Sequence, residues 1–416
     1  MNDLVSRRAL IGALGAGALL PSLGSAQSYA AAGIPASSKE LWAWVAAQLV
    51  VDPRLAWLDT AGFGPALSAV MVREYRSRER QSLDFREYEA AVLAPEPLAQ
   101  RLADVAGFLG AGPDEVAFTS GALAGVGLVA RGLDLQPGDE ILAGSDERPA
   151  VLGAWRTEAE RRGWKLVELP QPGVPDSPAT IVGRYAGAIT PRTRVLLLSH
   201  VQATDGTVMP VRELCDLARA NRALSVVDGA LGPGHVDVRV AELGCDAYAA
   251  AFHHWTNAGW GIGALYLRRD VQPSIWPATG VARDAAAAHE RYGAASRCLG
   301  PATEGLGVAL DFQRVVTTAR IGTRIRELAA YLRLQLATLP GAEILTPANA
   351  ALNAGIVALR LPRGDHAAVA SALADEDGIV VGHVLQGAFD ALRISVHPGN
   401  DFDQLDRCVN ALRHRL

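Results

Sequence analysis

Two adjacent histidines, His253 and His254, follow the apolar run "AYAAAF" in the middle of the chain. Imidazole titrates closer to neutral pH than other side chains, so a histidine can accept and return a proton during a reaction. Upstream, Asp228 ends the apolar stretch "SVVDG". A buried carboxylate needs a partner, and a histidine can serve as one. We therefore expect His254 and Asp228 to be able to form a pair that performs acid–base chemistry.

The other candidate groups give no metal or redox signal. Five histidines fall in predicted loops or at strand ends, but no H-x-x-H or H-E-x-x-H spacing occurs, so we predict no metal site. The four cysteines are far apart and form no C-x-x-C pair, which is typical of small core residues.

A mainly parallel sheet must position these residues, because apolar runs alternate with segments of helical periodicity along most of the chain. The last two predicted strands are expected to form an antiparallel pair at one edge. The strands are predicted in residues 114–120, 139–144, 164–170, 193–201, 223–230, 245–252 and 261–269.

Two structural parts are expected after an N-terminal leader. Residues 40–300 are predicted to form a large α/β domain, and residues 301–416 a long helix followed by a small C-terminal α+β domain. The segment 40–60 is a candidate for packing with the small domain.

The first 26 residues resemble a twin-arginine-type signal peptide. Arg7 and Arg8 precede a short apolar run, which leads through Pro21 to small residues that end at Ala26. The run is shorter than the about 20 apolar residues of a membrane span. This pattern predicts a periplasmic protein with no membrane segment after removal of the signal. The alternative is that the segment stays attached as an anchor.

Charge argues against nucleic acid as a partner. The net charge is −5, and loss of the signal makes it one unit more negative. The charged stretch at 73–89 alternates in sign, which is typical of a solvated helix rather than of a phosphate-binding surface.

Several strings in order resemble the class V aminotransferase family, and within it the isopenicillin N epimerase-like and cysteine desulfurase-like branch. They are "WLDTAGFGP", "RGLDLQPGDEIL", "DGTVMPVRELCDLAR", "VVDGALGPGHVDV" and "LRISVHPGN". The resemblance runs from about residue 40 to the C-terminus. It implies the type I fold of pyridoxal-phosphate (PLP) dependent transferases, with a large sheet of seven-stranded type, and a homodimer.

The same resemblance places a cofactor-binding lysine of the family at His254. Imidazole has no primary amine and cannot form the imine that this lysine makes with PLP. The whole chain contains two lysines, Lys39 in the first predicted helix and Lys165 at the start of a predicted strand. We therefore predict that covalent PLP chemistry is absent.

Other family positions differ as well. Ala122 lies in the turn that holds the phosphate in the family, Arg148 replaces a ring-stacking histidine, Leu231 a glutamine and Ala251 a serine. These changes predict a degenerate PLP site and no cofactor. Two family features are kept. Asp228 matches the aspartate that pairs with the pyridine nitrogen, and Arg393 matches the arginine that binds a substrate carboxylate through two hydrogen bonds.

Three functions remain open at this stage. The first is a PLP-independent lyase, isomerase, cyclase or hydrolase acting on a small carboxylate, with His254 and Asp228 as catalytic residues. The second is a non-catalytic binding or partner protein, and the third holds PLP non-covalently on Asp228 and a helix N-terminus. The substrate-binding residues expected for the first function are Arg393, His253, Arg148 and His200.

Overall fold

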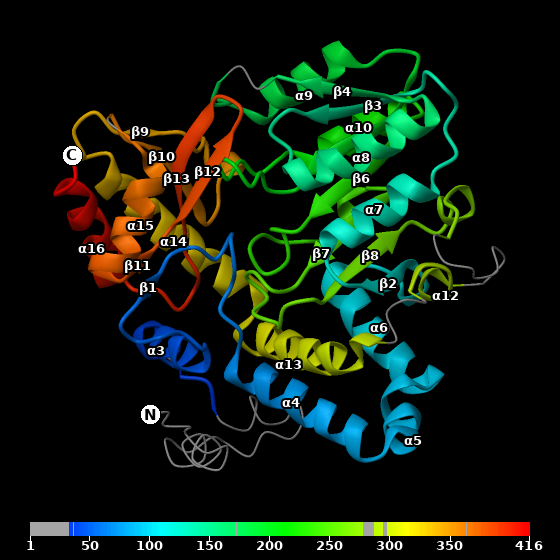
Figure 1. The fold of residues 1–416 in the computed structure, drawn as a ribbon, viewed down its shortest axis with the longest axis horizontal. Helices are drawn as coiled ribbons and strands as arrows, with labels where there is room; N and C mark the ends of the chain where they lie inside the picture. The colour runs from blue at the N-terminus through cyan, green and yellow to red at the C-terminus, as the bar shows by residue number, and fades with distance from the viewer. Residues whose placement is uncertain (1–32, 36, 171–172, 278–286, 294–297, 363) are drawn as a thin grey trace, which may run out of the picture.

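The computed structural model describes residues 33–35, 37–170, 173–277, 287–293, 298–362 and 364–416. The predicted signal peptide lies outside this described part. Figure 1 shows a large sheet wrapped in helices beside a smaller sheet that belongs to the C-terminal quarter of the chain.

The large sheet has seven strands in the order β2-β8-β7-β6-β5-β3-β4. All run parallel except β8, which is antiparallel to both of its neighbours, β7 and β2. The predicted α/β class and the seven-stranded, mainly parallel sheet are therefore confirmed. The strands are β2 (Val116–Thr119), β3 (Glu140–Gly144), β4 (Lys165–Leu169), β5 (Thr193–Ser199), β6 (Leu224–Gly229), β7 (Ala247–Ala251) and β8 (Gly263–Leu267).

One detail of the predicted sheet is wrong. The antiparallel pair of β7 and β8 forms as expected, but it does not lie at the edge, because β2 pairs with the outer side of β8. The strand β2 comes from residues more than a hundred positions earlier in the chain, and local periodicity carries no information about such pairing.

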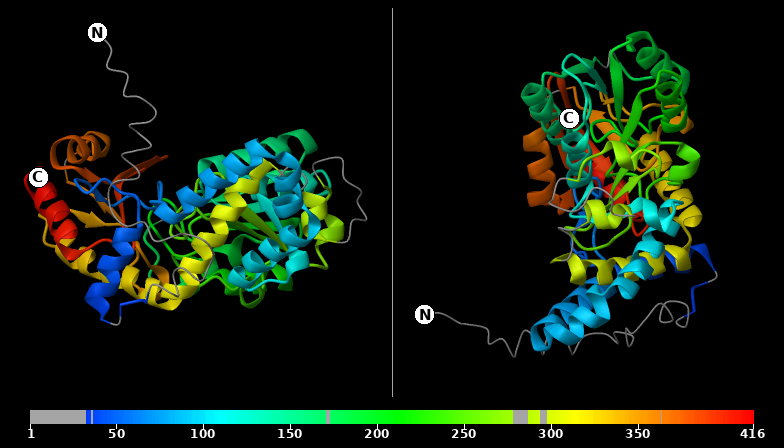
Figure 2. Two further views of the ribbon diagram at one scale, coloured as in Figure 1. Left: turned by 90° about the horizontal axis from the view of Figure 1, so that it is seen from below. Right: turned by 90° about the vertical axis from the view of Figure 1, so that its right-hand side faces the viewer.

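Buried apolar runs explain why these segments form the middle of the sheet. The strands β5, β6 and β7 are buried along almost their whole length, as expected of parallel strands covered on both faces. Helices lie on both sides of the sheet (Figure 2). They include α6 (Pro95–Leu109), α7 (Ala122–Gly132), α8 (Pro149–Arg162), α9 (Pro178–Ala188) and α10 (Val211–Ala220).

Further helices are described before residue 300. The stretch of mixed charge at 73–89 lies in α4, α5 and the turn that follows them. These helices are α3 (Ser38–Gln48), α4 (Ser68–Leu83), α5 (Phe85–Tyr88), α11 (Val240–Leu243) and α12 (Ala288–Tyr292). Within the described residues, no helix has the length and the apolar character that crossing a membrane requires.

The predicted long helix after residue 300 is interrupted. It consists of α13 (Gly300–Val316) and α14 (Thr318–Leu336), with Thr317 between them at φ 73°. The side chain of Thr317 accepts a hydrogen bond from the amide of Arg320 and so caps the second helix. β-Branched residues at 315–318 have low helix propensity, and a threonine hydroxyl competes for backbone groups, so this is a favourable place for a break.

The small domain is a four-stranded antiparallel sheet in the order β12-β13-β10-β9. A separate pair joins β1 (Ala56–Trp57) to β11 (Ile379–Val380), so a segment from near the N-terminus packs with the C-terminal part. The remaining elements are β9 (Glu343–Ile344), β10 (Ile356–Arg360), α15 (His366–Asp377), β12 (Gly382–Gln386), β13 (Phe389–Ser395) and α16 (Phe402–Arg413).

Candidate functional site

The carboxyl ends of the parallel strands gather the polar residues of the candidate site at one edge of the large sheet. Parallel strands end at the same edge, and ligands of open α/β sheets bind there. The ends of β3, β6 and β7 lead to Arg148, Asp228 and the pair His253–His254 respectively. The end of β2 leads into the first turn of α7, so that helix begins at the same edge.

Arg148 and Asp228 form an ion pair at the centre of this edge, in which Asp228 is buried and Arg148 is partly exposed. Arg148 Nε lies 2.6 Å from Asp228 Oδ2, and the Asp228 side chain is only 2% exposed. Burial opposes the charge of Arg148, but Asp228 outweighs this effect and the pKa of Arg148 is raised. Nη2 of Arg148 is buried and makes no hydrogen bond within the described chain, so the guanidinium can still donate to a ligand.

His254 is bonded to the backbone and not to Asp228. Its Nδ1 lies 3.0 Å from the carbonyl oxygen of Thr60, which can only accept, so Nδ1 carries the proton. Burial, and next the neighbouring His253, hold the pKa of His254 well below its usual value. The ring is therefore a neutral imidazole whose Nε2 has a free lone pair. The predicted His254–Asp228 pair is wrong, because a guanidinium competes for the carboxylate more strongly than a neutral ring.

The loop that carries both histidines is held by the segment before α4. Gly64 donates to the carbonyl of His253 at 3.0 Å, and Asn257 Nδ2 donates to the carbonyl of Pro65 at 2.8 Å. Gly64 lies so close that a Cβ there would come within 1.9 Å of the His254 carbonyl oxygen. A side chain at this position would displace the histidine loop, which explains the glycine.

His253 lies in an aromatic stack that reaches the surface. Its ring centroid is 4.1 Å from that of His254 and 4.8 Å from that of the exposed Trp260. Burial, and secondarily Arg148, lower the pKa of His253 to about 4. Its Nδ1 is buried and has no partner among the described residues, which leaves it free for a ligand.

Arg393, on β13 of the small domain, already has internal partners. Its Nη2 lies 3.0 Å from Asp59 Oδ1 and its Nη1 donates to the carbonyl of Ala203 at 3.0 Å. Only Nε is buried without a partner in the described chain. A substrate carboxylate must therefore approach Nε or displace Asp59, and this differs from the predicted open clamp with two free donors.

His200 does not join these residues. Its Nδ1 lies 2.9 Å from the hydroxyl of Tyr248, and burial lowers its pKa to about 4. His235 and His397 accept hydrogen bonds from the backbone amides of Gly355 and Gly399, respectively. The geometry gives these three histidines structural contacts and offers no support for the predicted substrate role of His200.

Glu147 belongs to the site, although sequence reasoning missed it. It is fully buried, and Ser199 donates to it through its amide at 2.7 Å and through its hydroxyl, while Gln202 Nε2 donates at 3.2 Å. Burial, reinforced by the nearby Asp146, raises the pKa of Glu147 to about 8. The sequence could have indicated Glu147, because this residue follows a predicted strand whose end lies at the same sheet edge as Asp228.

Glu147 is expected to make stability depend on pH. Its folded pKa of about 8 lies above the unfolded value of about 4.3, so the folded chain binds this proton more tightly. The free energy of unfolding should therefore fall as pH rises through this window. Glu147→Gln has no proton to lose, so between pH 5 and pH 8.5 its decline should be smaller by about 4 kcal/mol in urea unfolding.

A buried glutamate of ordinary pairing serves as the control. Glu158 pairs with Arg161 and Arg162, and Glu158→Gln shows how much stability the loss of a buried glutamate carboxylate costs at a single pH. A Glu147→Gln variant whose stability follows the wild-type pH curve would contradict the assignment of this proton to Glu147.

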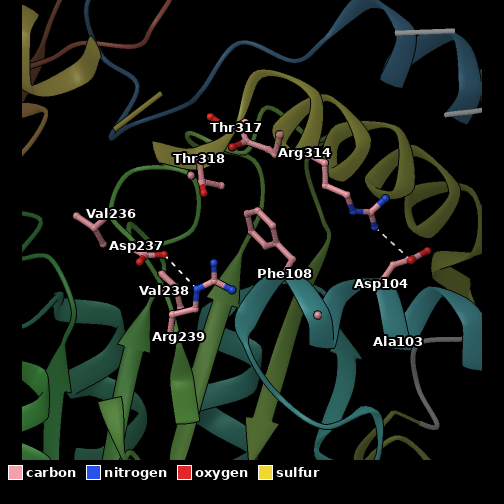
Figure 3. Close-up of a pocket in the computed structure, with 13 residues that line it drawn as sticks. Ala103, Asp104, Phe108, Val236, Asp237, Val238, Arg239, Arg314, Thr317 and Thr318 are labelled. Atoms are coloured by element: carbon pink, nitrogen blue, oxygen red, sulfur yellow. Dashed lines mark hydrogen bonds and ion pairs between the residues drawn. The ribbon is translucent and has the colours of Figure 1, made fainter. Parts of the chain in front are cut away.

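A separate cavity of about 520 Å³ lies below the start of α14 (Figure 3). Its two guanidiniums are paired, Arg239 with Asp237 at 3.4 Å and Arg314 with Asp104 at 3.2 Å. Its lining contains none of the residues of the candidate site. No group of histidines, cysteines and carboxylates among the described residues is arranged to hold a metal ion.

The chain belongs to the aminotransferase class V family, whose model matches residues 67–408. It is 32% identical to isopenicillin N epimerase of Streptomyces clavuligerus, over 89% of this chain and 97% of the epimerase. It is 34% identical to a probable cysteine desulfurase of Pseudomonas aeruginosa, over 75% of this chain and 81% of that protein. The resemblance predicted from the sequence strings is thereby confirmed.

Solved structures show the same fold. A cysteine desulfurase of Escherichia coli superimposes with a TM-score of 0.75 at 24% identity and covers 90% of this chain and 98% of its own. A lysine-to-alanine mutant of C-DES, with glycine covalently linked to its PLP cofactor, superimposes with a TM-score of 0.76 at 23% identity, over 87% of this chain and 97% of its own. The predicted type I PLP fold is confirmed.

These comparisons correct the prediction of no cofactor, which is contradicted because the solved neighbours include a PLP-bound protein. The prediction relied on the missing lysine at His254 and on other changed side chains, among which Ala122, Leu231 and Ala251 are buried and apolar in the structure. Side-chain losses say little about contacts that the backbone makes.

The backbone and Asp228 fit PLP. No side chain caps α7, so its first amide groups remain available to a phosphate, and a Cβ at Gly121 would meet open space. A cavity of about 550 Å³ runs along α7 and α8 from Ser120 and Gly121 as far as Arg131, and its lining does not include Asp228 or Arg148. Asp228 accepts from Arg148 at Oδ2 and from the amide of Ala230 at Oδ1, so a ring nitrogen would share one of these oxygens.

No described lysine reaches this edge. Lys165 is exposed at the first residue of β4, which places it at the opposite edge of the parallel sheet, and Lys39 is exposed on α3. The residues present therefore fit PLP that is held without a covalent bond to the protein.

Proposed function

We propose that this chain is an enzyme that binds PLP non-covalently, together with a small amino-acid-like carboxylate substrate, and moves a proton on that substrate. The observation that carries the proposal is the composition of the carboxyl edge. It keeps Asp228 and an uncapped helix N-terminus, while both lysines of the chain lie elsewhere. The PLP-bound lysine mutant of C-DES supports it, since that variant also holds the cofactor linked to an amino acid.

PLP, when bound, withdraws electrons from the substrate and makes a proton on the adjacent carbon acidic. His254 is suited to accept that proton, because its Nδ1–H is held by Thr60 and its Nε2 is unprotonated. The lowered pKa of His254 keeps the ring unprotonated at neutral pH, and it also makes the ring a weaker base than an ordinary histidine.

The two arginines account for substrate binding in this proposal. Arg393 Nε and Arg148 Nη2 are buried donors without partners in the described chain, and both suit a carboxylate. Arg148 has a second role, because its bond to Asp228 satisfies one oxygen of that carboxylate. The nitrogen of a bound pyridine ring would share Asp228 with the guanidinium of Arg148. The positive charge of Arg148 would make protonation of that nitrogen less favourable.

Reversible binding of PLP is the test of the proposal. In titration calorimetry the wild type should bind a phosphopyridoxyl amino acid, a stable compound of the cofactor with an amino acid, and release it on dialysis. Asp228→Asn should weaken this binding about tenfold, because a charge-assisted hydrogen bond is lost. Asp237→Asn, at an exposed aspartate of the separate cavity, is the control. Failure of the wild type to bind would overturn the proposal.

Proton transfer gives a second readout. With PLP present, the wild type should exchange the α-proton of a bound amino acid with deuterium from the solvent, and His254→Ala should lose this exchange while it keeps ligand binding. Binding without any exchange in the wild type would favour the alternative of a non-catalytic binding protein.

We also propose export through the twin-arginine-type segment at residues 1–26 and assembly as a homodimer. The arginine pair supports export, and large apolar side chains exposed on α4 and α5, among them Met71, Tyr75 and Phe85, support a partner surface. Cell fractionation tests the first, and light scattering coupled to gel filtration tests the second. A cytoplasmic or a monomeric protein would contradict the respective statement.

A further inference from the structure

A third cavity, of about 490 Å³, opens between the carboxyl edge of the large sheet and the small domain. On one side lie Asp146 and Asp205, from the loops after β3 and β5. On the other lie Leu345 and the tip of the β12–β13 hairpin with Phe389. The cavity thus has an acidic wall and an apolar wall.

Two cations lie near the acidic wall, Arg184, which acts electrostatically on Asp146, and Arg360, which lines the cavity. Glu343, which also lines the cavity, is paired with Arg360 at 2.7 Å, so these two charges cancel. Asp146 Oδ1 is buried and accepts no hydrogen bond in the described chain. Asp205 is 6% exposed, and its Oδ1 accepts from the amide of Thr207 at 2.8 Å.

Burial destabilises both carboxylates. It raises the pKa of Asp146, although Arg184 acts in the opposite direction, and it raises the pKa of Asp205 to about 6. A buried carboxylate is costly without a cationic or hydrogen-bonding partner. A ligand that brings an ammonium group would supply that partner to both residues.

The cavity adjoins the candidate site through two short connections. Asp146 precedes Arg148 by two residues, and Asp205 follows Ala203, whose carbonyl accepts from Arg393, by two residues. Gln386 at the hairpin donates to the carbonyls of Ser145 and Glu147, both at 2.9 Å, and so fixes the hairpin against the loop of Arg148. The loops that carry Asp146 and Asp205 are therefore the same loops that carry Arg148 and the backbone acceptor of Arg393.

We infer that this cavity binds a distal ammonium group of the substrate, which makes the preferred substrate a diamino acid or an amino acid with an amine-bearing side chain. The inference rests on the proposed function. The apolar wall suits the methylene groups of such a side chain, while the ammonium group contacts Asp146 and Asp205.

The test compares two ligands of equal shape that differ in one charge. Phosphopyridoxyl-L-ornithine ends in an ammonium group, and phosphopyridoxyl-L-norleucine ends in a methyl group. In calorimetry the wild type should bind the ornithine compound about tenfold more tightly, as expected for a charge-assisted contact. Asp146→Asn and Asp205→Asn should each bring the ratio toward one.

The double variant Glu343→Gln, Arg360→Gln is the matched control, because it removes a paired carboxylate together with its guanidinium and so keeps the net charge of the cavity. It should leave the ratio of the two affinities unchanged. Equal binding of both compounds by the wild type, or an unchanged ratio in both aspartate variants, would overturn the inference alone. Binding of neither compound by the wild type would overturn the proposed function together with it. The use of two separate aspartate variants keeps the test valid if one of them does not fold.

Discussion

A His254→Lys variant mixed with PLP is expected to bind it covalently, so that reduction with borohydride leaves a stable label on the protein. Residue 254 follows β7 at the same edge as Asp228 and the start of α7, where the cofactor is proposed to lie. Burial lowers the pKa of a lysine and makes its amine nucleophilic. The label should approach one per chain in the variant and stay at background in the wild type, as measured by mass spectrometry of the intact protein.

A variant at the neighbouring residue 253 tests whether labelling depends on the position of the amine. His253→Lys places the same amine one residue earlier, in the aromatic stack with Trp260, and should be labelled far less. Equal labelling of both variants would mean that the reaction is non-specific. A labelled wild type would contradict non-covalent binding, and an unlabelled His254→Lys variant that folds would show that residue 254 does not face the cofactor.

Removal of the Asp228 carboxylate is expected to lower the stability of the fold. In Asp228→Ala the guanidinium of Arg148 keeps its charge, while its partner at 2.6 Å is gone and its Nη2 has no other acceptor in the described chain. Loss of one member of a fully buried pair costs about 3 kcal/mol, but Arg148 is 27% exposed and solvent screens part of its charge, so we expect a cost of about 1.5 kcal/mol. The free energy of unfolding in urea should fall by about this amount.

Replacement of both members separates charge from packing. The double variant Asp228→Ala, Arg148→Met should recover most of the loss, because no uncompensated charge remains. Glu343→Ala is the comparison for an exposed pair and should cost less than about 1 kcal/mol. If the double variant were as unstable as Asp228→Ala, the cost would come from a cavity and not from the charge of Arg148.

The arrangement of strands was predictable because apolar runs and their ends are local properties. The end of "SVVDG" placed Asp228 at the carboxyl edge, and the ends of neighbouring runs placed His254 and Arg148 near it. The choice of partner for Asp228 was not predictable. Periodicity shows which residues reach an edge, but only packing decides that Arg148 bonds Asp228 while His254 bonds the carbonyl of Thr60.

Contacts between distant segments account for the other differences. Asp59 and Arg393 are 334 residues apart in the chain, so the predicted open clamp could not reveal its internal partner. The break at Thr317 was difficult to predict for another reason. Sequence analysis treated the absence of proline as continuity, whereas a threonine can end one helix and cap the next.

The mistaken prediction of no cofactor has a physical cause as well. Sequence comparison counts side chains, and the missing lysine together with three apolar replacements suggested a lost site. The amide groups at the start of α7 exist whatever side chain stands at Ala122, and they provide much of what binds an anion. An anion-binding site that is formed partly by backbone amides is retained when many side chains are substituted.

The pairing of β1 with β11 determines when the N-terminal segment can reach its folded position during synthesis. Ala56 and Trp57 bond to residues at 379 and 380, so the early segment must wait for nearly the whole chain before it gains this partner. Closing so long a loop is entropically costly, and contacts of this range form late. The same early segment supplies Thr60 and Gly64, which hold the His253–His254 loop. A nascent chain that stops short of the last strands should therefore lack an ordered site, although most of the large sheet has been made.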